Sequence, residues 1–144
     1  MNEDRSMPNE GLRVLTYNEC VSLLQRHRFG RLALGIQGWP AILPVNYLYD
    51  GTSVVIRTAP GAKLDEAPMT AVAFEIDDAD RFGHWGWSVL IQGPEFDITT
   101  SADELSEHLR ELPVRPWVPG ARDHWLKISA VRISGRAFGE PEFD

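Results

Sequence analysis

The order of apolar and polar residues along the chain begins with a helical pattern. Residues 16–27 carry apolar side chains at the three- and four-residue spacing of one helix face. Thr16 and Glu19 fit a capping box, in which a hydroxyl and a carboxylate bond the free N–H groups of the first turn. The pattern therefore predicts a helix that ends near His27, with Gly30 suited to the exit from it.

After residue 30 the period of the pattern changes to two, which is typical of β-strands. The dipeptide Asp50-Gly51 favours a tight hairpin between two of the alternating segments. Six strands with mostly short connections predict a small antiparallel barrel or sandwich. We expect the strands at residues 31–37, 41–49, 53–58, 70–77, 85–99 (with a bend at Gly93-Pro94) and 124–137.

Two further helical segments are expected between the strands. Residues 62–67 favour a single helical turn. Ser101 and Glu104 form a second capping box, followed by a helical stripe of leucines. The segment 113–120 contains three prolines and cannot continue that helix. The stripe consists of Leu105, Leu109 and Leu112.

The length of 144 residues corresponds to one domain, which we place at 15–138, between a flexible lead-in at 1–14 and an acidic tail at 139–144. The net charge of −7 argues against a broad nucleic-acid surface and against anionic membranes. The polar first residues show no apolar signal region, and Cys20 is the single cysteine in the sequence. We therefore expect a cytoplasmic protein.

The segment 57–63, with the sequence RTAPGAK, is the strongest candidate for binding an anion. Residues 52–63 contain two bases and no acid, although the chain as a whole is acidic. A phosphate is bound by charged donors, a hydroxyl and the backbone N–H groups of a glycine turn. A solvated arginine and lysine at a strand end would give the same pattern. The donors are Arg57, Thr58, Gly61 and Lys63.

Other motifs either exclude a class of site or leave it open. There is no P-loop, Rossmann fingerprint, nucleophile elbow or metal-ligand spacing, so we expect no metal site. Ser88 is a polar residue inside an apolar strand and needs a partner. Trp117 and Trp125 either close a barrel end or flank a planar ring, and Trp39 and Trp85 are expected in the core.

Six segments occur in an order that resembles the pyridoxamine 5′-phosphate oxidase-like family of FMN-binding split-barrel flavoproteins. They are PVNYLYDG, IRTAPGAK, AFEID, GWSVLIQG, RPWVPGARDHWLKI and SGR, and the resemblance runs from Leu15 to Arg136. It implies a mainly β fold, a six-stranded antiparallel split β-barrel with two or three short helices. It also implies a homodimer with two equivalent cofactor sites at the subunit interface.

The resemblance also implies which residues bind FMN. The phosphate would be held by the RTAPGAK segment, with Gly61 giving access to the backbone. Ser88 would point towards the pyrimidine edge of the flavin, and Trp125 and Trp117 would come from the other subunit. The candidate cofactor-binding residues are Pro44, Val45 and Asn46, largely through their backbone, with Arg57, Thr58, Gly61, Lys63, Ser88, Trp117 and Trp125.

The activity implied is that of an FMN-dependent oxidoreductase that moves hydride through flavin N5 to or from a small substrate. No general base is assigned, and vitamin B6 oxidation is not implied because the C-terminal Arg-x-His signature is not matched. The deazaflavin coenzyme is an alternative, and its acidic tail would favour Arg115 and Arg122. A non-catalytic flavin or haem carrier or sensor is another, with His84 or His124 as a haem ligand.

Overall fold

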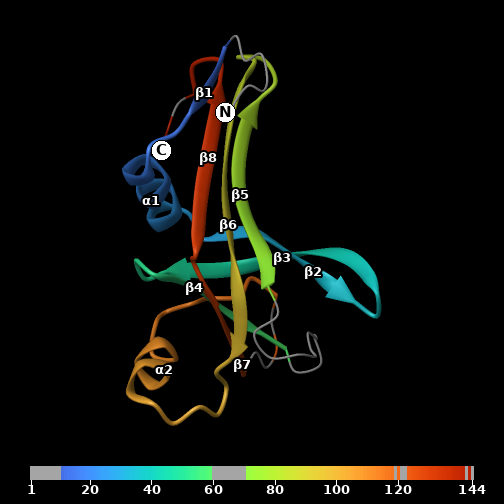
Figure 1. The fold of residues 1–144 in the computed structure, drawn as a ribbon, viewed down its shortest axis with the longest axis vertical. Helices are drawn as coiled ribbons and strands as arrows, with labels where there is room; N and C mark the ends of the chain where they lie inside the picture. Colours follow the sequence, from blue (N-terminus) through green and yellow to red (C-terminus); the bar gives the residue numbers. More distant parts are fainter. Residues whose placement is uncertain (1–10, 60–70, 119, 121–122, 142, 144) are drawn as a thin grey trace.

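The computed structural model describes residues 11–59, 71–118, 120, 123–141 and 143, and it forms a closed antiparallel barrel (Figure 1). The barrel strands are β2 (Phe29–Ile36), β3 (Trp39–Tyr49), β4 (Ser53–Thr58), β5 (Ala71–Asp80), β6 (Trp85–Asp97) and β7 (His124–Ser129). They close in the order β6–β5–β2–β3–β4–β7–β6. This confirms the expected six-stranded barrel.

Two more strands extend the barrel wall on one side. β8 (Arg132–Phe138) pairs with the first half of β6, and β1 (Leu12–Val14) pairs with β8. The expectation of one strand over 124–137 was therefore wrong. The chain turns at Ala130 and Val131, so that β7 and β8 pair with different halves of β6.

β6 continues through the predicted bend at Gly93-Pro94 and belongs to two sheets. One sheet contains β5 and β8, and the other contains β4 and β7. Residues 85–94 pair with β5, whereas residues 95–97 pair with β7. A Cβ atom at Gly93 would overlap the carbonyl oxygen of Ser129. Only glycine lets the two backbones approach this closely where the strand changes sheets.

The first helix, α1 (Tyr17–Arg26), begins where the capping box predicts. Thr16 Oγ1 accepts from Glu19 N at 3.1 Å, and Glu19 Oε1 accepts from Thr16 N at 2.8 Å. The helix ends at the C-cap His27, as expected. Gly30 is not the exit: it lies inside β2, where a Cβ would come within 2.6 Å of the Phe74 ring.

The N-cap of the second helix, α2 (Glu104–Leu109), lies two residues later than predicted. Its N-cap is Asp103, whose carboxylate accepts from Ser106 N at 3.0 Å. The prediction of a capping box at Ser101 was wrong, because an aspartate is an equally good N-cap and also interacts favourably with the helix dipole. The turn expected at 62–67 lies outside the described residues.

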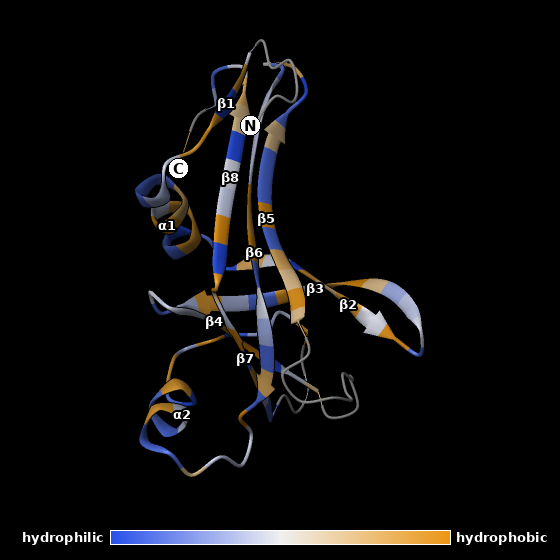
Figure 2. Cartoon of the chain, viewed as in Figure 1, coloured by the Kyte–Doolittle hydropathy of each residue, from blue (hydrophilic) through white to orange (hydrophobic). Residues whose placement is uncertain are grey.

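The apolar core has two parts. The larger fills the barrel, and Figure 2 shows the apolar residues distributed along its strands. The smaller cluster lies between the outer side of β4 and β7, helix α2 and the segment that follows it. Its buried members are Val55, Ile98, Leu109, Val114 and Trp125. No helix in the described part of the chain has the length and apolar character needed to cross a membrane.

The β2–β3 hairpin projects beyond the barrel (Figure 1), because β2 pairs with β5 only over residues 31–33. Trp39 begins β3 beside the hairpin turn, and 76% of its surface is exposed. The expectation that Trp39 packs in the core was therefore wrong. Trp85, by contrast, is half-buried against the main core.

Candidate functional site

Four residues from four neighbouring strands form a row across the barrel wall. Phe29 of β2 is the ladder partner of Asn46 in β3, and Arg57 of β4 is the partner of Trp125 in β7. The register of β3 with β4 places Asn46 beside Arg57, one step beyond their last ladder pair. Neighbouring strands are about 4.8 Å apart, so these four residues, here called the cross-strand row, span about 14 Å.

The cross-strand row faces outwards from the barrel. Side chains alternate between the two faces of a strand, so Arg57 shares a face with Val55, which packs in the smaller cluster outside the barrel. Asn46 shares a face with Leu48, which packs against the same cluster. The row therefore faces α2 and the segment that follows it.

Residues 114–118, here called the strap, lie against this row. At the start of the strap, the Val114 side chain is 1% exposed in the smaller cluster. The Val114 carbonyl accepts a hydrogen bond from Arg57 Nη1 at 3.2 Å. This end of the strap is anchored by both packing and a charged donor.

The other end of the strap rests on Phe29 and Asn46. Trp117 N donates to Asn46 Oδ1 at 2.7 Å. The Trp117 ring stacks on Phe29 with 4.7 Å between ring centroids and 2° between ring planes. The indole is nevertheless 68% exposed. The row and the strap thus present a stacked aromatic pair at the surface.

The amide nitrogen of Asn46 has no hydrogen-bond partner among the residues that the structure describes. This atom, Nδ2, is buried. Because Oδ1 accepts from Trp117 N, the orientation of the amide is fixed by a short contact. A buried donor without an acceptor costs free energy. The site therefore contains an unused donor beside an aromatic pair.

Arg57 is held at the centre of the row by contacts within its own chain. Its guanidinium carbon lies 5.1 Å from the centroid of the Trp125 ring, a cation–π contact. A guanidinium has five N–H donors, so an anion can share it with protein partners. Thr58 follows, half-buried and paired with His124. Gly61 and Lys63 lie outside the described residues.

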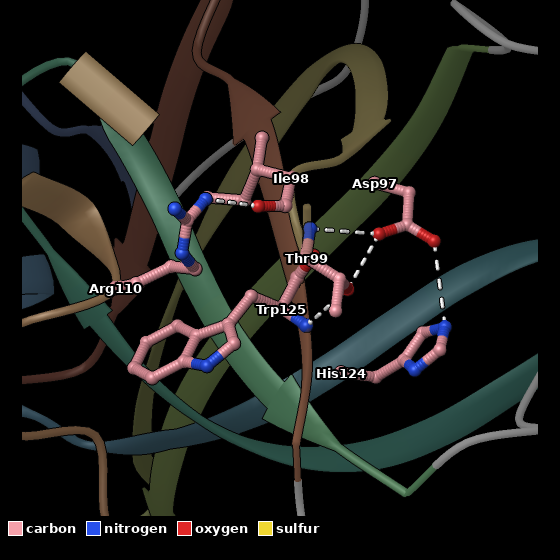
Figure 3. Close-up of polar contacts among 6 residues, drawn as sticks. All are labelled: Asp97, Ile98, Thr99, Arg110, His124 and Trp125. Carbon is pink, nitrogen blue, oxygen red and sulfur yellow. Dashed lines mark hydrogen bonds and ion pairs between the residues drawn. The ribbon is translucent and has the colours of Figure 1, made fainter. Parts of the chain in front are cut away.

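A polar network fixes the beginning of β7 beside this site (Figure 3). Asp97 accepts from Thr99 N at 2.9 Å and from Thr99 Oγ1 at 2.6 Å, and its other oxygen lies 3.4 Å from His124 Nε2. Thr99 Oγ1 in turn accepts from Trp125 N at 3.0 Å. Arg110 of the segment after α2 donates to the Ile98 carbonyl at 2.6 Å. These contacts hold Trp125 against Arg57.

The remaining candidate residues take different positions. Pro44 is exposed and Val45 packs against the main core, both just before Asn46 in β3. Ser88 is half-buried in β6, on the sheet that β6 forms with β5 and β8, and does not belong to the row. Trp125 packs within its own chain and is 9% exposed. The contacts of all these residues with a flavin stay predictions.

A charged cluster lies on the outer face of the Ser88 sheet. Arg31 donates to Glu75 Oε1 through Nε at 3.0 Å and Nη2 at 2.8 Å, and Nη2 also lies 2.7 Å from Asp77 Oδ1. Asp77 is the ladder partner of Ser88. Burial, together with the neighbouring Asp77 carboxylate, raises the pKa of Glu75 above its usual range, while Arg31 opposes this.

Two parts of the site were not predicted from the sequence. Phe29 was left between the helix and the first strand, although the period-two pattern extends back to it through Arg31. The Val114 carbonyl was not considered, since a backbone acceptor has no sequence signal. The nearest signal was the run of prolines after α2, which indicates an irregular segment able to lie on the barrel surface.

Comparison with known proteins agrees with this architecture. The family model of pyridoxamine 5′-phosphate oxidase matches residues 16–137. The protein Rv0080 of Mycobacterium tuberculosis is 31% identical over 127 residues, which cover 84% of this chain and 82% of that protein.

Two solved structures resemble the whole domain. An FAD binding protein from Mycobacterium smegmatis is 29% identical with a TM-score of 0.71, and the match covers 89% of this chain and 98% of that one. An FAD-binding protein from Mesorhizobium loti is 25% identical with a TM-score of 0.64, covering 88% and 97%. With the match to the family model over residues 16–137, these findings confirm the resemblance, and the chain belongs to the pyridoxamine 5′-phosphate oxidase-like family.

Proposed function

We propose that this protein binds a flavin nucleotide and exchanges hydride between the flavin and a small substrate. The observation that carries the proposal is the cross-strand row. Together with the strap, it brings the Arg57 guanidinium, the unpaired Nδ2 donor of Asn46 and the Phe29–Trp117 ring pair to one outer face of the barrel. A flavin nucleotide combines the matching groups, which are a phosphate, hydrogen-bond acceptors and a planar ring. The similarity to two FAD-binding proteins supports the same reading.

The phosphate would bind at Arg57, in the half of the row that β4 and β7 form. Arginine is suited to phosphate because its planar fork offers paired, charged donors. Thr58 adds a hydroxyl at the adjacent position. Lys63 and the backbone of Gly61 would complete the phosphate site, as the sequence predicts. A single phosphate site of this kind suits FMN, which carries one phosphate. We therefore propose FMN as the cofactor.

The flavin ring would lie towards Asn46 and the Phe29–Trp117 pair. The Nδ2–H group of Asn46 is a donor suited to the carbonyl oxygens and ring nitrogens of a flavin. Aromatic side chains favour stacking with a planar ring. When bound, the flavin supplies hydride transfer at N5, while the chain binds and orients it. Ser88 would add a polar contact from the other sheet.

A second copy of the chain is part of this proposal. The projecting hairpin carries the exposed side chains of Trp39 and Ile42, beside a largely apolar groove of about 990 Å³ that also reaches Val131 and Arg132. Large exposed apolar patches of this kind are typical of protein interfaces. We therefore infer that two copies of the chain form a homodimer. From the sequence, we also infer a cytoplasmic location. Sedimentation equilibrium tests the dimer, with Trp39→Asp expected to shift the mass towards that of one chain.

The test of the cofactor is a titration of purified protein with FMN, FAD and riboflavin, followed by flavin fluorescence. The proposal expects saturable binding of FMN, a yellow protein after gel filtration, and reduction of the bound flavin by NADH or NADPH. If FAD binds more tightly than FMN, the cofactor is FAD and the assignment of FMN is wrong. Bound flavin without reduction favours a carrier. If the deazaflavin coenzyme or haem binds and no flavin does, the flavin proposal is wrong.

A further inference from the structure

The strap is buried at its Val114 end and largely exposed at its Trp117 end. Val114 is buried in the smaller cluster, and its carbonyl accepts from Arg57. Trp117, three residues later, is held by one hydrogen bond and one ring stack, and most of its indole is exposed. Val118 beyond it is also exposed. A movement of residues 115–118 about Val114 would therefore disturb few contacts.

Such a movement would change the hydrogen bonding of the Asn46 side chain. With the strap in place, one end of its amide is satisfied by Trp117 N. The other end, Nδ2, is buried and has no hydrogen-bond partner among the described residues. Because Trp117 N lies 2.7 Å from Oδ1 of the same amide, the strap lies directly against this side chain. Its removal would break that contact and open this side of the amide, with Nδ2, to water or to a ligand. The penalty of the buried donor is thus relieved in the open state, which brings the free energies of the two states closer together.

The same geometry prevents a ligand from using Asn46 while the strap is closed. A buried donor atom cannot bond a ring acceptor that approaches from solvent. A ligand that forms a hydrogen bond with Asn46 Nδ2 can therefore do so only when the strap is open. Arg57 is less affected, because its contact with the strap is at the anchored end.

We propose that the strap is a gate on the ligand site and that Asn46 is its latch. In the closed state Asn46 Oδ1 holds Trp117 N, and in the open state Nδ2 donates to an acceptor of the bound ring. Residues 115–118 then close over the ligand from the anchored Val114. The identity of the ligand rests on the proposed function, whereas the movement is a property of the chain alone.

The movement can be measured without ligand by fluorine NMR on protein that contains 5-fluorotryptophan. The five tryptophan signals are assigned with single Trp→Phe variants. Asn46→Leu removes both acceptor and donor at similar volume, and Asn46→Asp keeps acceptor oxygens for Trp117 N. We expect the Trp117 signal to broaden by exchange in the wild-type protein, to shift to a new position in Asn46→Leu, and to stay at the closed position in Asn46→Asp.

The signals of Trp39 and Trp125 are the internal controls. Trp39 is exposed but remote in the fold, and its signal should not change in either variant. Trp125 is buried, and an unchanged Trp125 signal shows that the variants are folded. A Trp117 signal that is sharp and identical in the wild type and both variants would overturn the gate.

Stopped-flow mixing with FMN then tests the role of the gate in binding. If opening limits entry, the observed rate of flavin quenching rises with FMN concentration and then reaches a plateau. We expect Trp117→Ala to raise this plateau at least tenfold, and Phe82→Ala, at an exposed ring between β5 and β6, to leave it unchanged. A rate that rises linearly at all concentrations and is the same in Trp117→Ala contradicts the gate. If equilibrium dialysis detects no FMN binding, the flavin proposal fails, and the NMR result still decides whether the strap moves.

Discussion

Arg57 and Trp125 are ladder partners on β4 and β7, and the guanidinium of Arg57 lies over the indole at 5.1 Å from its centroid. This contact and the hydrogen bond from Arg57 Nη1 to the Val114 carbonyl hold the charged group between the indole and the strap. A lysine has neither the fork nor the flat surface for this arrangement. The orientation of Arg57 is therefore set by the protein before any ligand binds.

Arg57→Lys should weaken the binding of FMN by about 10- to 100-fold, because a point charge replaces a preorganised fork at the phosphate. Fluorescence titration measures the dissociation constant. Riboflavin, which lacks the phosphate, is the matched ligand, and its affinity should change less than about threefold. An equal loss of affinity for both ligands would show that Arg57 does not contact the phosphate.

Tyr47→Phe should destabilise the protein by about 1–2 kcal/mol. The Tyr47 side chain is 1% exposed, and its hydroxyl donates to the Leu24 carbonyl at 2.7 Å, tying α1 to β3. Burial raises the pKa of Tyr47 well above its usual range, so the hydroxyl stays protonated as a donor at all moderate pH values. Urea unfolding measures the change. Tyr49→Phe, at a partly buried 3.0 Å contact with the Gly51 carbonyl, should cost less.

Gly30→Ala should cost about 1–3 kcal/mol, since the new methyl group would lie 2.6 Å from the Phe74 ring and 2.8 Å from the Glu75 carbonyl oxygen. Gly35→Ala, in the same strand, is the matched control. Its nearest neighbour would be the Trp39 carbonyl oxygen at 4.0 Å, so its effect should stay within about 0.5 kcal/mol. Thermal and urea unfolding of the two variants compare them directly. Equal effects would contradict the close packing at Gly30.

Glu75→Gln should change how stability depends on pH. Burial raises the pKa of Glu75 in the folded state above the value of 4.5 that applies in the unfolded chain. The folded state therefore binds more protons in this window, and the contribution of Glu75 is fully present below pH 4.5 and lost as the pH rises through the raised pKa. The stability of the wild type relative to Glu75→Gln should fall over that interval. Urea unfolding at a series of pH values measures it, and a constant difference would argue against a raised pKa.

The barrel itself could be predicted because each of its strands has a local signal. Alternation located the strands, and Asp50-Gly51 located a hairpin that the structure shows between β3 and β4. The division of the last strand at Ala130 could not be predicted, because both halves alternate. It arises from the change of sheets in β6, which is a property of the tertiary structure.

The candidate site could be predicted only in part for the same reason. Asn46, Arg57 and Trp117 were singled out, but as separate motifs, and the contact between Trp117 and Asn46, which are 71 residues apart in the chain, is a long-range property. Phe29 was missed because its role comes from its ladder partner and not from its neighbours in sequence. The unpaired amide nitrogen of Asn46 becomes visible only once the contacts of the folded chain are known.

The passage of β6 through both sheets also determines how the molecule comes apart. Its first part is bonded to β5 and β8 and its last part to β7, with no break at Gly93. A backbone shared in this way cannot leave one sheet without pulling on the other. The barrel should therefore melt as one cooperative unit, with the hairpin end and the strap end losing their structure at the same temperature.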